Sequence, residues 1–285
     1  MESRYVLRNE PEFPTSLLEI KPVIKGLWSK GNLKLVESPK TVAIVGSRRM
    51  SQYGKRVLAE IVPKLIEHEY VTISGFMYGI DAEMHRLTIE NGGKTIGVFG
   101  WGIDAPIIPE NQNLYNKVLE SDGLFLSELE PMELGALWTF PRRNRIVVGL
   151  ADMVIVVEAG MKSGSLGSAE WARKMGKPVY AVPGSIFSSV SVGCNWLIAQ
   201  GLAKPMTLDF FKDKNYPEKV RMNRAKVIMS EGEGNLVTQL TLEGPSSVNE
   251  LSRRMEVSVG LISALLTSLL LKGEVREERG IWMIV

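Results

Sequence analysis

Short β-rich runs alternate with amphipathic stretches through the middle of this chain, and most of the runs close on glycine. The first run, at residues 41–46, precedes a stretch of helical periodicity that continues to about residue 66. We expect Pro63 to kink or break that helix. Strands separated by helices need crossover connections, which favour a mostly parallel sheet covered on both faces. The sequence therefore predicts a doubly wound α/β domain.

The same pattern repeats to about residue 182. The further expected strands are residues 71–75, 94–100, 124–128, 153–159 and 179–182. The expected helices between them are residues 81–91, 110–120, 142–150 and 165–175. We assign this large domain to residues 39–211.

The two ends of the chain follow other patterns. Residues 1–38 form an N-terminal extension in which residues 24–28 are a candidate edge strand. Residues 212–232 form a basic linker. Residues 233–285 predict a small C-terminal domain, with helices and a terminal strand pair in the order of a winged helix. Its expected elements are helices at 236–240, 247–255 and 259–272 and strands within 275–285.

Composition excludes several kinds of site. The formal net charge is only +2, so nucleic-acid binding would have to come from local basic patches. The single cysteine, Cys194, excludes an internal disulfide and fits a reducing cytoplasm. Two histidines make a histidine metal site improbable. No apolar run is long enough to span a membrane, and no signal peptide is recognisable. We predict a cytoplasmic protein with no membrane association, metal or cofactor.

Loops that suit phosphate binding follow the expected strands. The first strand ends in Gly46, Ser47, Arg48 and Arg49, ahead of a helix. Ligands of doubly wound sheets bind beyond the carboxyl ends of the strands, where glycine allows close approach and helix amides attract anions. Similar loops begin at Ser74-Gly75 and at Lys162-Ser163-Gly164-Ser165. Neither a P-loop nor a dinucleotide fingerprint occurs, which argues against NAD.

A basic run follows Phe140. It contains Arg142, Arg143, Asn144 and Arg145, at the start of an expected helix whose basic end should face out of the fold. Arginines pair with phosphates and an aromatic ring can stack on a base, so the run suits a polyanion. The alternative is a solvated basic turn.

Other conspicuous residues have ordinary structural explanations. Asp81 is expected to cap a helix, and His85 to pack or bond locally. Trp138, Trp171 and Trp196 are expected in the core and receive no function.

Several motifs in order resemble one family. They are Val45-Gly46-Ser47-Arg48, Ser74-Gly75 with Gly79-Ile80-Asp81 and His85, Phe140-Pro141 with Arg143-Asn144-Arg145, Lys162-Ser163-Gly164-Ser165 and Ala181-Val182-Pro183-Gly184. This chain resembles the bacterial DNA-processing protein A family (DprA, also called Smf) over about residues 40–211. Met77 and Ser168 depart from the residues common there.

The resemblance implies an extended Rossmann-like domain that binds single-stranded DNA, forms a homodimer, protects incoming strands in natural transformation and loads RecA recombinase. It implies no enzymatic activity. The predicted DNA-binding residues, with Arg49, Lys55 and Arg142 added from charge and position alone, are Gly46, Ser47, Arg48, Arg49, Lys55, Ser74, Gly75, Phe140, Arg142, Arg143, Asn144, Arg145, Lys162, Ser163, Gly164 and Ser165.

Two alternatives use the same fold. One is an enzyme similar to nucleotide phosphoribohydrolases, with Glu170 near the nucleotide. The other is a nucleotide-sensing domain with the tail as its output.

The expected third helix of the tail has no lysine or arginine before Lys272, so we expect the tail to bind protein and not duplex DNA.

Overall fold

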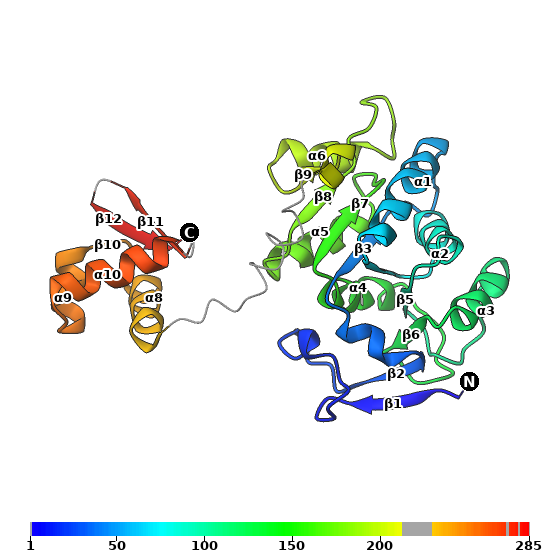
Figure 1. Cartoon of the computed structure of the whole chain (residues 1–285), viewed down its shortest axis with the longest axis horizontal. Coiled ribbons are helices and arrows are strands. Elements are labelled where there is room, and N and C mark those ends of the chain that lie inside the picture. Colours follow the sequence, from blue (N-terminus) through cyan, green and yellow to red (C-terminus); the bar gives the residue numbers. More distant parts are fainter. Residues whose placement is uncertain (1, 213–229, 272–273, 279, 285) are drawn as a thin grey trace. The chain divides into compact units, whose positions relative to one another are not determined.

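The chain folds into two compact units, residues 1–221 and 222–285 (Figure 1). The structure is a computed structural model, and it describes residues 2–212, 230–271, 274–278 and 280–284. Most of the predicted basic linker lies outside the described residues.

The first unit is built on a nine-stranded sheet in the order β1-β2-β6-β5-β4-β3-β7-β8-β9. In this order, all neighbouring strands from β6 to β9 pair in parallel, whereas β2 pairs antiparallel with β6. This confirms the predicted mostly parallel α/β fold. The strands are β1 Arg4–Leu7, β2 Gly26–Gly31, β3 Thr41–Val45, β4 Val71–Ser74, β5 Thr95–Phe99, β6 Leu124–Ser127, β7 Met153–Val156, β8 Val179–Ala181 and β9 Lys204–Pro205.

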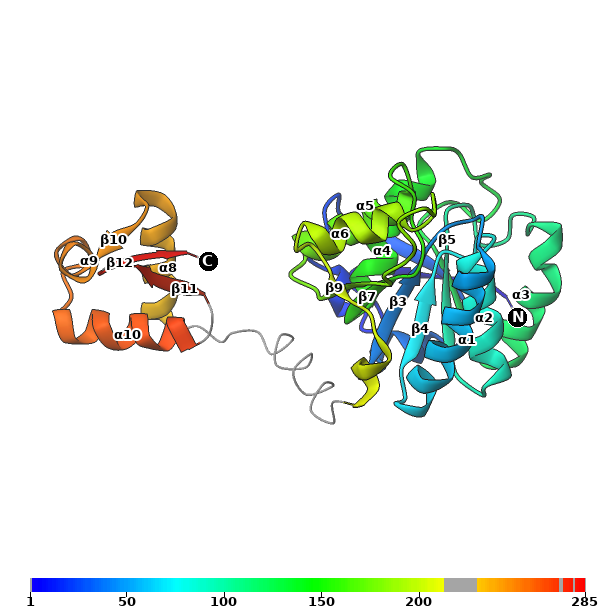
Figure 2. The ribbon, with the colours of Figure 1, turned by 90° about the horizontal axis from the view of Figure 1, so that it is seen from above.

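Helices cover both faces of this sheet (Figure 2). The helices α1, α2 and α3 lie on one face, and α4, α5 and α6 on the other. Their bounds are α1 Gln52–Glu67, α2 Ile80–Glu90, α3 Gln112–Glu120, α4 Thr139–Leu150, α5 Gly164–Lys174 and α6 Val192–Ala199.

Strand β3 shows why the apolar runs are continuous. Its side chains alternate between the two faces, and both faces are buried. Val42 and Ile44 pack among the residues of α1 and α2, whereas Ala43 and Val45 pack against the α4 and α5 side. All four are at most 7% exposed.

The N-terminal region belongs to the sheet. Strand β2 pairs antiparallel with β6, and β1 pairs antiparallel with β2. The expected strand at residues 24–28 is therefore real but shifted, and β1 forms the edge in its place. Buried Leu17 and Ile24 join the core on the α4 face.

Helix α1 is continuous through Pro63, so of the predicted kink or break, the break does not occur. Leu58, Ile61, Val62 and Leu65 are buried on either side of the proline. This apolar face packs along the sheet, and its burial outweighs the backbone hydrogen bond that proline removes.

The described residues of the second unit form three helices and a three-stranded sheet in the order β10-β12-β11. The three expected helices and the terminal strand pair are present, but β10 was not expected and the first helix is longer than predicted. A capping box between Ser230 and Glu233 starts that helix. The elements are α8 Glu231–Glu243, β10 Ser246–Ser247, α9 Val248–Met255, α10 Val259–Leu271, β11 Val275–Glu278 and β12 Ile281–Ile284.

Within the described ranges, no single helix is long and apolar enough to cross a membrane. Helices α9 and α10 pass that test only as a pair, with a bend of 115° between them.

Candidate functional site

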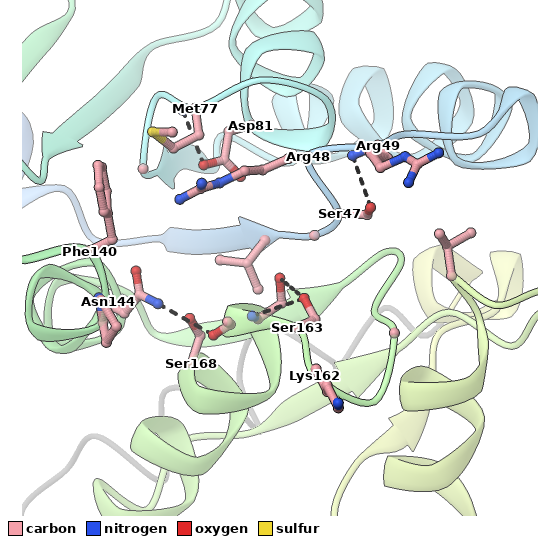
Figure 3. A pocket seen from close by; sticks show the side chains of 18 of the residues that line it. Ser47, Arg48, Arg49, Met77, Asp81, Phe140, Asn144, Lys162, Ser163 and Ser168 are labelled. Atoms are coloured by element: carbon pink, nitrogen blue, oxygen red, sulfur yellow. Dashed lines mark hydrogen bonds between the residues drawn. The ribbon is translucent and has the colours of Figure 1, made fainter. Parts of the chain in front are cut away.

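A cavity of about 740 Å³ opens beyond the carboxyl ends of β3, β4 and β7. Strand β3 lies between β4 and β7, so the chain winds outward in both directions from this point. Such a switch point is where doubly wound sheets bind ligands. Figure 3 shows Arg48 on one side of the cavity and Asn144 and Ser163 on the other.

Most of the predicted residues meet here. The predicted residues that line the cavity are Gly46, Ser47, Arg48, Arg49, Gly75, Phe140, Arg143, Asn144, Lys162, Ser163, Gly164 and Ser165. Their placement is observed; their contact with DNA stays a prediction.

The loop after β3 presents two exposed arginines, Arg48 and Arg49. The Ser47 hydroxyl accepts a hydrogen bond from the Arg49 amide at 3.0 Å, which turns the loop back on itself. Packing alone requires a glycine at position 46, because a Cβ there would strike Ile80.

The N-terminus of α1 is already occupied by a carboxylate. Glu158, only 1% exposed, accepts hydrogen bonds from both the amide and the hydroxyl of Ser51, the N-cap of α1. A Cβ at Gly54 would come within 2.6 Å of that carboxylate. Glu158 therefore supplies negative charge at this helix terminus, and binding of a ligand anion by the helix amides stays a prediction.

The Arg48 guanidinium lies over the ring of Phe140, with 5.1 Å between Cζ and the ring centroid. Phe140 also packs edge-on against Trp101. The ring thus holds the charge of Arg48 at the cavity by a cation–π contact.

The opposite wall is the N-terminus of α5. Ser163 is its N-cap and accepts from the Ser165 amide at 3.2 Å. Exposed Lys162 precedes the cap, and a Cβ at Gly164 would meet no atom within 4 Å. This terminus is open to the cavity, so its amides and Lys162 can attract a phosphate. Asn144 links α4 to it by donating to the Gly164 carbonyl at 3.4 Å.

Arg143 forms the floor of the cavity. Its guanidinium donates to the carbonyls of Gly75 and Val98 at the ends of β4 and β5, and only 6% of the residue is exposed. Gly75 lacks a side chain because a Cβ there would strike this guanidinium. The pKa of Arg143 is lowered to about 10, chiefly because burial disfavours its charge, while Asp81 raises it and Arg48 lowers it. Arg143 stays charged at neutral pH.

Two titratable groups lie near Arg143 beneath the surface. Burial raises the pKa of Asp81, against the favourable effect of Arg143 and of the Met77 amide, which donates to it at 3.3 Å. His85 is fully buried, and burial lowers its pKa to about 3. Its Nδ1 lies 2.6 Å from the Thr95 hydroxyl, as the expected local role requires. Asp81 is in the first turn of α2, where Gly79 is the N-cap, so the expectation that it is the cap is wrong.

Four predicted residues lie outside the cavity: Lys55, Ser74, Arg142 and Arg145. Arg145 is 0% exposed and donates to both carboxylate oxygens of Glu128, at 2.7 and 2.8 Å. The expectation that the whole basic run faces outward is therefore wrong. Ser74 is buried and donates to the Ile44 carbonyl, and Lys55 is exposed on α1.

Some lining residues had not been predicted. Leu137, Ser168, Ser189 and Val190 line the cavity, the last two from the loop between β8 and α6. The serines and the glycine of that loop are the residue types used to predict the other phosphate-binding loops, so the same criterion could have identified this loop from the sequence. The core assignment is wrong for Trp138, which is 57% exposed, and for Trp196, which is 40% exposed.

Among the described residues, no group of three or more His, Cys, Asp or Glu side chains could hold a metal ion.

Known proteins share this architecture. Residues 4–210 match the family model described as DNA recombination-mediator protein A. The chain is 43% identical over 189 residues to the DNA processing protein DprA of Streptococcus pneumoniae, covering 66% of each protein. It is 36% identical over 190 residues to the protein Smf of Escherichia coli, covering 66% of this chain and 50% of that protein. The chain thus spans from half to just under two thirds of the length of these relatives.

Two solved structures agree in fold. DNA processing protein A from Streptococcus pneumoniae superposes with a TM-score of 0.68 at 40% identity, covering 74% of each chain. The homologue from Helicobacter pylori, whose structure concerns its single-stranded DNA binding mode, gives 0.64 at 30% identity and covers 76% of this chain and 96% of that one. The family match spans most of the first unit and includes every loop that lines the cavity, so the chain belongs to the DNA recombination-mediator protein A family, also known as DprA or Smf.

Proposed function

We propose that this chain binds single-stranded DNA through the cavity at the switch point and mediates recombination without catalytic turnover. The observation that carries this proposal is the charge of the cavity. Arg48, Arg49 and Lys162 are exposed around it. The one acid among its described lining residues, Asp81, is 8% exposed and faces Arg143. Phosphates of any sequence suit such a surface.

The Helicobacter pylori homologue supports the choice of ligand, since its structure concerns a single-stranded DNA binding mode. The cavity also combines charge with the planar Arg48–Phe140 pair, and strand binders use both. Protection of incoming strands in natural transformation, loading of RecA recombinase, a homodimer and a cytoplasmic location complete the proposal. Family membership is the support for that part.

The enzyme alternative has less support. Glu170, which this alternative places near the nucleotide, lies on the outside of α5, with its side chain 60% exposed and paired with Lys174 at 2.7 Å. It does not line the cavity. If the chain releases the base from a nucleoside monophosphate, and Glu170→Gln abolishes this activity, the enzyme alternative would be supported.

The test is fluorescence anisotropy of a labelled dT oligomer and of the matching duplex across a salt series. We expect tighter binding to the single strand. Arg48→Ala and Lys162→Ala should each reduce the slope of log K against log salt by about 0.7, because each removes one phosphate contact. Lys117→Ala, at an exposed position on α3 away from the cavity, is the matched control. An unchanged slope in both cavity variants would contradict the assignment. Displacement by mononucleotides with no preference for the strand would favour the sensor.

A further inference from the structure

An exposed apolar segment borders the cavity. Between β6 and α4, four large apolar side chains occur within seven residues: Met132 at 66% exposed, Leu134 at 71%, Leu137 at 92% and Trp138 at 57%. Scattered exposed apolar residues are ordinary, but a cluster of them commonly marks a contact surface.

The backbone of this segment is fixed. The amides of Gly102 and Asp104 donate to the carbonyls of Glu133 and Pro131, at 2.7 and 2.8 Å. Buried Thr139 closes the segment by donating to the Gly100 carbonyl at 2.6 Å. The apolar side chains are therefore held outward by an ordered backbone, and a ligand that meets them gains contact without ordering a loop first.

Trp138 is itself oriented by a charge. The Arg142 guanidinium lies over its ring, with Cζ 5.9 Å from the centroid, and also donates to Glu128 at 3.1 Å. Glu128 is shared with buried Arg145, so one carboxylate faces two guanidiniums. Glu130 and Glu133, in the same segment as Trp138, add two further carboxylates to this surface. An exposed, flat apolar ring with a guanidinium over it suits the stacking of a nucleobase.

The segment is continuous with the cavity. Leu137, the neighbour of Trp138, lines it, and Phe140 lies two residues further on beneath Arg48. A strand that leaves the cavity past Leu137 would meet Trp138, the next residue along the chain. We propose that Trp138, supported by Leu137 and Arg142, is a stacking platform that receives a base of the bound single strand outside the cavity. This inference rests on the proposed function.

The experiment compares the full chain with Trp138→Ala and Trp138→Phe on two labelled dT oligomers, one intact and one with abasic sites. Loss of one stacked base should weaken binding of Trp138→Ala to the intact oligomer by about 5- to 150-fold. The salt slope should not change, because no phosphate contact is removed. Trp138→Phe should keep most of the affinity. Abasic sites should weaken the unmodified chain more than they weaken Trp138→Ala.

Trp196→Ala is the matched control, because Trp196 is a partly exposed tryptophan on α6 that does not line the cavity. It should bind like the unmodified chain.

Equal affinity of Trp138→Ala and the unmodified chain for the intact oligomer would overturn the platform and leave the segment as a protein contact. A reduced salt slope in Trp138→Ala would assign the loss to phosphates and also overturn it. If the unmodified chain binds no dT oligomer, the proposed function fails together with the platform. If Arg48→Ala weakens binding and Trp138→Ala does not, the platform alone fails.

Discussion

Arg142 and Arg145 bind the same carboxylate, that of Glu128, but their side chains are 40% and 0% exposed. Both belong to one basic run, and sequence alone could not separate them. The difference arises because α4 begins at Thr139 and turns Arg145 inward, where Glu128, at the end of β6, supplies its charge partner. Contacts to a residue 17 positions away leave no local signal.

Replacing either arginine should lower the free energy of unfolding, but by very different amounts. Arg145→Ala would leave a carboxylate short of its buried partner and should lower the free energy of unfolding by about 3–5 kcal/mol. Arg142→Ala removes an exposed ion pair and should lower it by no more than about 1 kcal/mol. Urea denaturation measures both. Similar losses in the two variants would contradict this division of roles.

Buried His85 makes stability depend on pH. Below about pH 6.5 the unfolded chain binds a proton on this imidazole, whereas the folded chain binds it only near pH 3. The unfolded state therefore binds more protons as the pH falls between those values, and folding loses about 1.4 kcal/mol per pH unit from this group. Between pH 7 and pH 5 the loss should be about 2 kcal/mol.

His85→Gln tests this effect, because glutamine can still bond to Thr95 but does not titrate. Unfolding free energies at pH 7 and pH 5 should differ by about 2 kcal/mol less in this variant than in the unmodified chain. An equal difference in both proteins would show that His85 is not the group responsible.

The elements of the first unit were predictable where burial on both faces makes a strand wholly apolar. Strands β3 to β8 lie within a few residues of their expected positions for that reason. Strand β1 and helix α6 were not predicted. The pairing of β1 with β2 depends on the long-range pairing of β2 with β6, and α6 is short, with a glycine in its first turn. The loops of the site were predictable because parallel strands end at one edge.

Helix α10 carries apolar residues on both sides, but only one side is packed. Leu266 is fully buried in the core of the second unit, whereas Leu271 is 84% exposed. Leu266→Ala should destabilise that unit by about 2–5 kcal/mol, and Leu271→Ala should change its stability by less than about 0.5 kcal/mol. Hydrogen exchange of the α8 and α10 amides measures the stability of the second unit in each variant. Equal protection in the two variants would contradict the assigned core.

At the scale of the whole molecule, every described residue that lines the cavity lies between Val45 and Val190, within the first unit. A fragment of residues 1–232 should therefore bind the dT oligomer with the affinity and salt slope of the full chain. Anisotropy at equal protein concentration checks this. A loss of affinity that returns at higher protein concentration would assign the second unit a part in assembly.

The position of Glu158 affects how well a free nucleotide can compete with DNA for the cavity. Doubly wound proteins that bind coenzymes place a pyrophosphate at the helix terminus after the first strand. Here a carboxylate of the protein bonds to the N-cap residue of that helix and adds negative charge there. The remaining charges, on Arg48, Arg49 and Lys162, belong to separate loops around the opening. Such an arrangement favours a ligand whose charges are spaced along a backbone over one that concentrates them in a single tail. Abundant ATP should therefore compete weakly with DNA for this surface.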